Sequence, residues 1–255
     1  MARGGYRPYF AVYSTFLQRA YDQIVHDVCL QNLPVCILSD HVGLVGDDGK
    51  THHGVLSVPM LMSIPNLTLL APRDTRQIRQ AVRATLKLDG PCVVQYPKEG
   101  IEPYAQNVTG EPFTVGKWQT LIPGGQDAVI LAYGRMTQNA IQASELLVQR
   151  GLSVGVIDCC SLKPLDMDCL RALFERRAKI VTIEEGEMIG GFGSEIARVC
   201  VEENADAPVQ IIGLENRFIT HGSVPELLRE CGLMPEQLAN RIEEIAGDKE
   251  SSHVG

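Results

Sequence analysis

The segment "PYFAVYSTFLQRAYDQIVHD", Pro8 to Asp27, places a short apolar strand directly before an amphipathic helix. Apolar side chains recur at three- and four-residue intervals along the helical part and just beyond it, which indicates one buried face; they are Leu17, Ala20, Tyr21, Ile24 and Val28. Thr15 and Gln18 fit a T-x-x-Q capping box at the helix start. Phe16 then falls in the first turn, off the apolar face, at the kind of strand-to-helix junction where parallel α/β sheets bind ligands.

The alternation of strand and helix continues along the chain. Strands are predicted first at 8–12, 34–38, 67–71 and 92–96, with helices at 15–31 and 74–88. After a polar stretch that follows Pro97, strands are predicted at 127–132, 152–157, 179–184 and 208–213, with helices at 137–150, 166–176, 193–204, 224–231 and 235–246. Such alternation is typical of mainly parallel sheets flanked by helices. We therefore expect an α/β protein of two consecutive domains, 1–108 and 109–255, of which the first is incomplete because it offers only four strands.

Composition and charge disfavour several classes of protein. Of the 255 residues, 45% are hydrophobic and 21% charged, and the net charge of −8 gives no reason to expect a nucleic-acid partner. No apolar run approaches the roughly 20 residues that span a bilayer, so no membrane association is expected. The eight cysteines form no C-x-x-C pair, and His52 and His53 are adjacent rather than at ligand spacing. We expect a cytoplasmic protein with reduced core cysteines and no metal site of its own.

Three further motifs each allow two interpretations. Five basic residues recur at helical spacing as a stripe that is either solvated or faces an anionic partner: Arg73, Arg76, Arg79, Arg83 and Lys87. The "GGFG" motif, Gly190 to Gly193, is either a flexible turn or an anion cradle at a helix start. The "GDDG" motif, Gly46 to Gly49, resembles a cation loop, although one acidic pair is weak support for a metal site.

Aromatic and titratable residues follow the predicted strands of the first domain. Tyr13 and Phe16 follow the first strand, the loop from Asp40 to His52 follows the second, and Tyr96 and Lys98 follow the fourth. The carboxyl ends of parallel strands share one edge of a sheet, so these side chains should gather there. Aromatic faces beside groups that transfer protons suit a flat heteroaromatic cofactor.

Several motifs carry a family resemblance: "YSTFLQRAYDQIVHDVCLQNLPV", "GDDGKTHHG", "IPNLTLLAPRD", "DGPCVVQYPKEG", "KPLD", "EEGEMIGGFGS" and "IGLENRFITHGS". From about Gly4 to Ala246 the chain resembles the second half of thiamine-diphosphate enzymes of the transketolase family, in particular the synthases that make 1-deoxy-D-xylulose 5-phosphate. The resemblance implies a partial pyrimidine-binding domain followed by a transketolase C-terminal domain. It also implies decarboxylation of pyruvate and addition of the remaining two-carbon unit to glyceraldehyde 3-phosphate, a step in isoprenoid and thiamine precursor supply.

The resemblance assigns roles to individual residues. It implies that Phe16 stacks on the aminopyrimidine ring of thiamine diphosphate and that Tyr13 and Arg19 also contact the cofactor. It implies that His52 exchanges protons with the substrate or an intermediate. The implied substrate-binding residues are Asp48, His41, Lys98 and Gln95, of which the last three stand where the family pattern has arginines.

The sequence also lacks parts of the family pattern. Relatives carry an acidic residue in a Glu-Gln-His context before the glycines that Gly4 and Gly5 match, and a further domain that binds Mg²⁺ and diphosphate; the 255 residues contain neither. We therefore expect a chain that is inactive alone: one half of a split enzyme with an N-terminal-half partner chain, or a truncated product. The homodimer of the family and a non-catalytic binding or dimerisation module remain further hypotheses.

Overall fold

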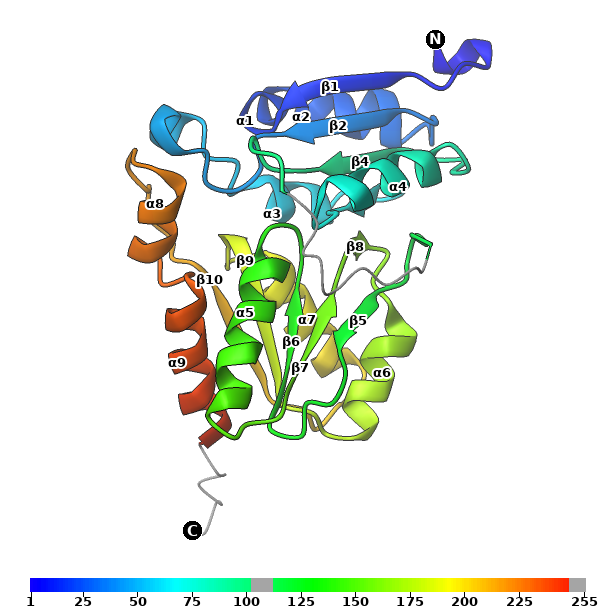
Figure 1. Cartoon of the computed structure of the whole chain (residues 1–255). Helices are drawn as coiled ribbons and strands as arrows, with labels where there is room; N and C mark the ends of the chain where they lie inside the picture. The colour runs from blue at the N-terminus through cyan, green and yellow to red at the C-terminus, as the bar shows by residue number, and fades with distance from the viewer. Residues whose placement is uncertain (102–111, 248–255) are drawn as a thin grey trace.

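The computed structural model describes residues 1–101 and 112–247, so the domain boundary expected at 108/109 lies outside the described residues. Two sheets lie one above the other (Figure 1). The first contains β1 (Tyr9–Tyr13), β2 (Cys36–Asp40), β4 (Cys92–Gln95) and β3 (Thr68–Leu70), parallel and in that order. A fifth strand, β8 (Ser161–Lys163), pairs antiparallel with β3. The four parallel strands were predicted, but the fifth, which comes from the second half of the chain, was not.

The helix after β1 is less regular than its sequence pattern suggests. It changes from α-helix (α1, Ser14–Leu17) through a 3-10 turn (Gln18–Ala20) and α2 (Tyr21–Gln23) to a π-helical stretch (Ile24–Cys29). The predicted capping box is wrong, because the helix begins at Ser14 and the Thr15 hydroxyl is buried without a hydrogen-bond partner among the described residues. The other helices of the first domain are α3 (Ser57–Met62), which was not predicted, and α4 (Thr75–Thr85).

The second sheet has the order β10-β9-β6-β7-β5. Its strands are β5 (Gln119–Ile122), β6 (Ala128–Ala132), β7 (Val154–Asp158), β9 (Ile180–Glu187) and β10 (Val209–Leu214). Its helices are α5 (Met136–Gln149), α6 (Met167–Glu175), α7 (Phe192–Glu202), α8 (Val224–Glu230) and α9 (Pro235–Gly247). Only β5, an antiparallel edge strand, was not predicted.

The hydrophobic core continues from one sheet to the other. Leu61 of α3 and Leu69 of β3 belong to the same buried cluster as Trp118 and Phe192 of the second domain. A buried polar network also joins the two domains: the Arg73 guanidinium contacts Asp158 at the end of β7, and Gln77 Nε2 donates to the same carboxylate at 2.6 Å. Because burial contributes about 25 cal/mol per Å² of apolar surface, this shared core ties the domains into one unit.

The structure bears on two of the open motifs. Arg73 is buried in that network. Arg76, Arg79 and Arg83 are exposed on α4 and Lys87 is exposed just after it, and this exposure suits either a solvated face or an anionic partner. The "GGFG" motif begins α7, and the backbone N–H groups of Phe192 and Gly193 both donate at 2.9 Å to the buried Glu184 side chain. The start of this helix therefore already has an internal hydrogen-bond acceptor, the Glu184 carboxyl group.

Two general expectations can be compared with the described residues. All eight cysteines are free, and six of them are buried, as expected for reduced core cysteines. No helix in residues 1–101 or 112–247 is long and apolar enough to cross a membrane.

Candidate active site

The carboxyl edge of the first sheet carries a continuous group of rings, which we call the aromatic cluster: Tyr13, Phe16, His41 and His52. Tyr13 stacks on His41, with centroids 3.7 Å apart, and on Phe16, with centroids 5.3 Å apart and planes 8° from parallel. Phe16 meets His52 edge to face at 5.7 Å. The rings come from the end of β1, the following helix and the loop after β2, as the sequence predicted for residues at this edge.

The Phe16 side chain is accessible within this cluster. It is 43% exposed, although large apolar side chains are more often buried. The Arg19 guanidinium carbon lies 5.7 Å from the centre of its ring. Tyr13, Phe16 and Arg19 therefore form one surface, and a flat ring could stack on it.

The loop between β2 and α3 brings His52 to the cluster. Its neck is closed by Gly43 and Gly54, which exchange backbone hydrogen bonds of 3.2 and 2.8 Å. A Cβ on Gly54 would lie 2.1 Å from Ser14 Oγ and 2.2 Å from the His41 carbonyl oxygen, so only glycine permits this approach. His52 Nδ1 lies 2.9 Å from Thr51 Oγ1, which leaves Nε2 as the ring nitrogen without a partner among the described residues.

His52 and its neighbour have different environments. His53 is buried, accepts a hydrogen bond from the Val45 N–H through Nδ1 at 3.1 Å, and donates through Nε2 to the Thr220 carbonyl oxygen at 2.9 Å. Both ring nitrogens of His53 therefore serve the fold. His52 is the histidine of the pair that remains able to transfer protons.

The structure also brings together Asp48 and Lys98. Lys98 Nζ donates to Asp48 Oδ2 at 2.8 Å, and both side chains are well exposed. This hydrogen bond lowers the pKa of the Asp48 carboxyl and raises the pKa of the Lys98 ammonium group. A ligand anion would therefore compete with Asp48 for Lys98.

The remaining two predicted substrate residues are less accessible. His41 is 8% exposed and has a left-handed backbone with φ 57°. Its Nδ1 lies 3.1 Å from Asp40 Oδ1, but neither atom has a hydrogen-bond partner among the described residues. Gln95 is 2% exposed, and its side-chain oxygen accepts from Ser57 Oγ at 3.2 Å. Gln95 lines a small cavity between the domains, with Tyr133 and Glu185, and no ring contact joins it to the aromatic cluster.

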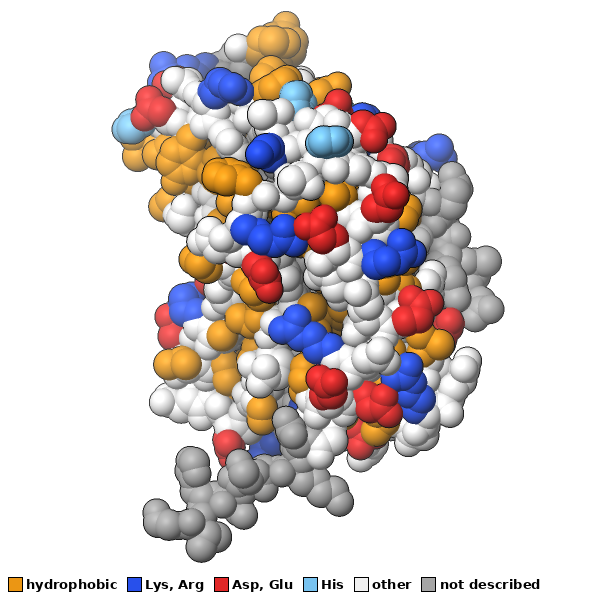
Figure 2. Space-filling model, turned by 90° about the vertical axis from the view of Figure 1, so that its left-hand side faces the viewer, with side chains coloured by type: hydrophobic (Ala, Val, Ile, Leu, Met, Phe, Trp, Pro, Cys, Tyr) orange, Lys and Arg blue, Asp and Glu red, His pale blue; other side chains and the backbone are white. Residues whose placement is uncertain are grey.

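The surface around the aromatic cluster carries charged, histidine and hydrophobic side chains together (Figure 2). Figure 2 shows histidine, basic and acidic side chains beside hydrophobic ones on the upper part of the molecule, over the first domain. Among residues 1–101 and 112–247, no group of three or more His, Cys, Asp or Glu is placed to hold a metal ion.

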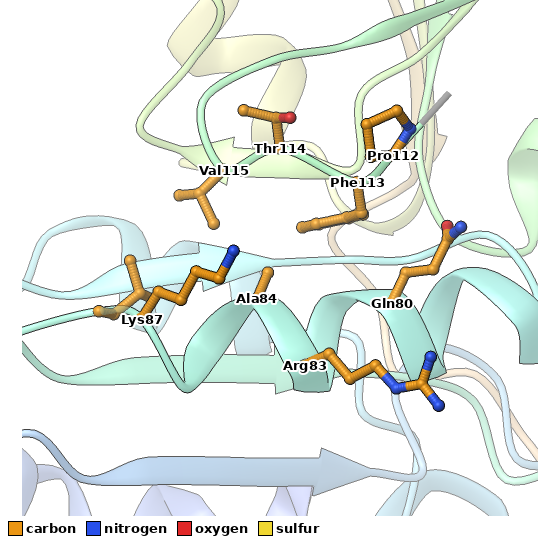
Figure 3. A pocket seen from close by; sticks show the side chains of 9 residues that line it. Gln80, Arg83, Ala84, Lys87, Pro112, Phe113, Thr114 and Val115 are labelled. Atoms are coloured by element: carbon orange, nitrogen blue, oxygen red, sulfur yellow. The ribbon is translucent and has the colours of Figure 1, made fainter. Parts of the chain in front are cut away.

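A separate groove lies along α4. It is lined by Gln80 and Arg83 of α4, by Lys87 just after that helix, and by Pro112 to Val115. In Figure 3, Lys87 reaches toward Val115 and the Phe113 ring lies above Ala84, whereas Arg83 points away. Among the described residues, no histidine or carboxylate lines the groove, in contrast to the aromatic cluster.

Comparisons with known protein families agree with the fold. Residues 1–102 match the pyrimidine binding domain of transketolase, and residues 116–238 match the transketolase C-terminal domain. The chain therefore belongs to the transketolase family, whose members use thiamine diphosphate, and consists of these two domains.

Curated relatives make the comparison more specific. The chain is 41% identical over 242 residues to 1-deoxy-D-xylulose-5-phosphate synthase of Thermus thermophilus, an alignment that covers 95% of this chain and 38% of that protein. It is 40% identical over 257 residues to the synthase of the same name from Bacillus velezensis, covering 100% of this chain and 40% of that protein. The chain thus spans about two fifths of the length of these relatives.

Solved structures show the same architecture. One, described as "Split gene transketolase, inactive beta4 tetramer", has a TM-score of 0.87 and 28% identity, and the match covers 98% of this chain and 79% of that one. Transketolase from Campylobacter jejuni has a TM-score of 0.78 and 18% identity, and the match covers 95% of this chain and 36% of that one. At this identity the likeness is one of fold alone.

Proposed function

We propose that this chain is the pyrimidine-binding and C-terminal half of a thiamine-diphosphate-dependent carboligase. The reaction would join pyruvate to glyceraldehyde 3-phosphate, giving 1-deoxy-D-xylulose 5-phosphate and CO₂ for isoprenoid and thiamine precursor supply. The observation that carries the proposal is the accessible Phe16 ring edge to face with His52 at the carboxyl end of the first sheet. Relatives named for this synthase, at about 40% identity, support the choice of reaction. A cytoplasmic location suits the eight free cysteines.

The residues of the cluster fit one part of the cofactor. Phe16 offers a flat apolar face for an aminopyrimidine ring, and Tyr13 and Arg19 border that face. When bound, thiamine diphosphate supplies the electron sink for decarboxylation. His52 would give or take a proton at Nε2, because Nδ1 is engaged by the Thr51 hydroxyl.

The phosphate group of glyceraldehyde 3-phosphate would be recognised by cationic groups that bind phosphate more weakly than arginines do. Lys98 provides a point charge that is already paired with Asp48, and Arg would provide a planar fork for phosphate. His41 borders the cluster through its stack on Tyr13. Gln95 is turned to Ser57, so its role would be to shape the floor of the site.

We infer that a partner chain supplies the rest of the cofactor site. The described residues offer no metal cluster, and the relatives of this chain are about two and a half times as long. The structural neighbour described as a split-gene transketolase supports a two-chain enzyme. Tyr9 and Phe10 on the outer strand β1 are exposed, and aromatic surface of this kind favours a protein partner. Mg²⁺, the diphosphate and the carboxylate that activates the pyrimidine would lie on that partner, and this chain alone would be inactive.

A second candidate is self-association without catalysis. The description of the split-gene neighbour as an inactive β4 tetramer specifically favours it. In that case the same aromatic surface of β1 would contact further copies of this chain. Measurement of the molar mass in solution, with and without a partner half, distinguishes an inactive homo-oligomer from a two-chain enzyme.

The direct test is reconstitution. The chain is co-expressed with the cofactor-binding N-terminal half of the Bacillus velezensis synthase, and product formation from pyruvate and glyceraldehyde 3-phosphate is followed by mass spectrometry. We expect turnover from the complex and none from either half. A purified complex that binds thiamine diphosphate normally but forms no product would refute the proposed reaction.

A further inference from the structure

Leu44 joins the loop that carries His52 to the core of the C-terminal domain. The Leu44 side chain is 1% exposed and belongs to the hydrophobic cluster of the second domain, with Ile130, Met136 and Val224. A residue of the first domain is thus built into the core of the other. This anchor lies between His41 and His52, the two histidines of the aromatic cluster.

Two charged residues of the second domain bind the backbone of that anchor. Glu185, on β9, accepts a hydrogen bond from the Leu44 N–H at 2.8 Å, and Arg135, before α5, donates to the Leu44 carbonyl oxygen at 3.0 Å. Arg135 also forms a forked ion pair with Glu185, with N···O distances of 2.9 and 2.7 Å. Both side chains are nearly buried. We call this arrangement the Arg135–Glu185 clamp.

Gly43, at the neck of the loop, leaves room for the Glu185 carboxylate of the clamp. A Cβ on Gly43, whose φ is 78°, would lie 2.6 Å from the Glu185 carboxyl carbon, so the carboxylate occupies the space that only glycine leaves free. At the other end of the loop, His53 is tied to the Thr220 carbonyl oxygen of the second domain. The second domain therefore holds the loop on both sides of Asp48, at Leu44 and at His53.

We propose that Arg135 and Glu185 are positioning residues, which set the place of His52 against Phe16 by fixing Leu44. Neither residue touches the aromatic cluster, so the clamp acts only through the loop. Buried hydrogen bonds to charged groups are strong and directional, and they hold backbone atoms more firmly than apolar contacts do. The catalytic consequence of this inference rests on the proposed function, but the placement of His52 does not.

The experiment removes the clamp without leaving a buried charge unpaired. The variant Arg135→Met with Glu185→Leu is compared with a control variant, Arg73→Met with Asp74→Asn and Asp158→Leu, in which Asp74 is made neutral because it also pairs with Arg73 at 3.2 Å. The control also removes a buried ion pair between the two halves of the chain, but it has no contact with the loop. Arg135→Lys serves as a milder variant, since it keeps the charge and loses the fork.

Two readouts need no enzyme activity. Hydrogen exchange of the amides in residues 43–54 should accelerate at least about tenfold in the clamp variant, while strands β6 and β9 keep their protection. The NMR signals of the His52 ring, displaced by the nearby Phe16, should move toward those of a free histidine. Arg135→Lys should show both changes to a smaller degree, and the control variant neither. Equal loosening in the control, or an unchanged His52 signal in both clamp variants, would overturn the inference.

A third readout links the clamp to catalysis. In the reconstituted enzyme, the clamp variant should lose about 10- to 100-fold in kcat, because small displacements of a reacting group are costly. The control should keep kcat within about threefold of the unaltered enzyme. A displaced His52 with unchanged kcat would show that the clamp is structural only. If the unaltered complex makes no product, the proposed function fails, while hydrogen exchange and NMR still decide whether the clamp places His52.

Discussion

The Phe16 ring and the His52 imidazole meet edge to face with their centroids 5.7 Å apart, although the two residues are 36 positions apart and follow different strands. Phe16 lies in α1, which follows β1, and His52 lies in the loop between β2 and α3. A hydrophobic ring face beside a proton-transferring group is the arrangement that a heteroaromatic cofactor would need. The following predictions test what each partner contributes.

His52→Ala should impair chemistry and leave the fold intact. The side chain is partly exposed, and its one hydrogen-bond partner among the described residues is the hydroxyl of the adjacent Thr51, so we expect a loss of unfolding free energy below about 0.5 kcal/mol. In the reconstituted enzyme, kcat should fall at least about 100-fold. His53→Ala is the matched control, because its two hydrogen bonds to backbone groups predict a loss of about 2 kcal/mol in stability. Initial rates should therefore show the larger loss of activity in His52→Ala, and thermal melts should show the larger loss of stability in His53→Ala.

Phe16→Ala should weaken cofactor binding by the reconstituted enzyme. Loss of one aromatic stacking face should cost about 1 kcal/mol, or roughly fivefold in Kd. Stability should change little, because 43% of the side chain is exposed in the isolated chain. Phe218→Ala, an 83% exposed aromatic outside the cluster, is the control and should bind the cofactor normally. Equal Kd values for thiamine diphosphate in all three proteins would remove Phe16 from the site.

Arginines should improve recognition of a phosphorylated aldehyde. His41→Arg with Lys98→Arg introduces planar forks that bind phosphate through paired hydrogen bonds. We expect the KM for glyceraldehyde 3-phosphate to fall about tenfold, which corresponds to about 1.4 kcal/mol. The KM for pyruvate should not change, which makes pyruvate the internal control. An unaltered KM for both substrates would mean that these positions do not face the phosphate.

Glu184 should make the stability of the protein depend on pH. Burial raises its pKa from 4.5 to about 7, against the opposing hydrogen bonds from Phe192 and Gly193. The folded protein thus holds the proton up to about pH 7, whereas the unfolded chain releases it near pH 4.5. Stability from this site is therefore fully present below pH 4.5 and is lost as pH rises to about 7, by about 3 kcal/mol in total.

The measurement compares urea unfolding at several pH values between 4.5 and 7.5. In Glu184→Gln, the slope of unfolding free energy against pH should be less negative than in the unaltered chain over that window. Glu202→Gln, an exposed carboxyl on α7, should leave the slope unchanged. Superimposable pH profiles for the unaltered chain and Glu184→Gln would show that Glu184 is ionised throughout.

Local sequence patterns predicted the parallel strands and the residues at their edge. β1, β2, β3 and β4 are apolar runs bounded by polar or turn-forming residues, and such patterns depend only on neighbouring residues. The gathering of Tyr13, Phe16, His41 and His52 followed, because parallel strands bring their carboxyl ends to one edge. The chemical roles of these residues came from the family resemblance rather than from the pattern.

The features that the sequence did not predict depend on contacts distant along the chain. β8 is three residues long, and its place beside β3 is supported by Lys163 Nζ, which donates to the Met62 and Ile64 carbonyl oxygens. No local periodicity signals such a strand. Local sequence patterns likewise do not predict the Arg135–Glu185 clamp, because Glu185 and Leu44 are 141 positions apart. Gln95 follows the edge pattern but is buried against Ser57.

The central claim is that this chain holds only the pyrimidine side of a cofactor site that a partner completes. Calorimetric titration of thiamine diphosphate with Mg²⁺ tests it most directly, first into the isolated chain and then into its complex with the N-terminal half of the Bacillus velezensis synthase. We predict no detectable binding to the chain alone, because one ring face contributes only about 1 kcal/mol, and micromolar binding to the complex. Micromolar binding to the isolated chain, or a stable complex that does not bind the cofactor, would contradict the account.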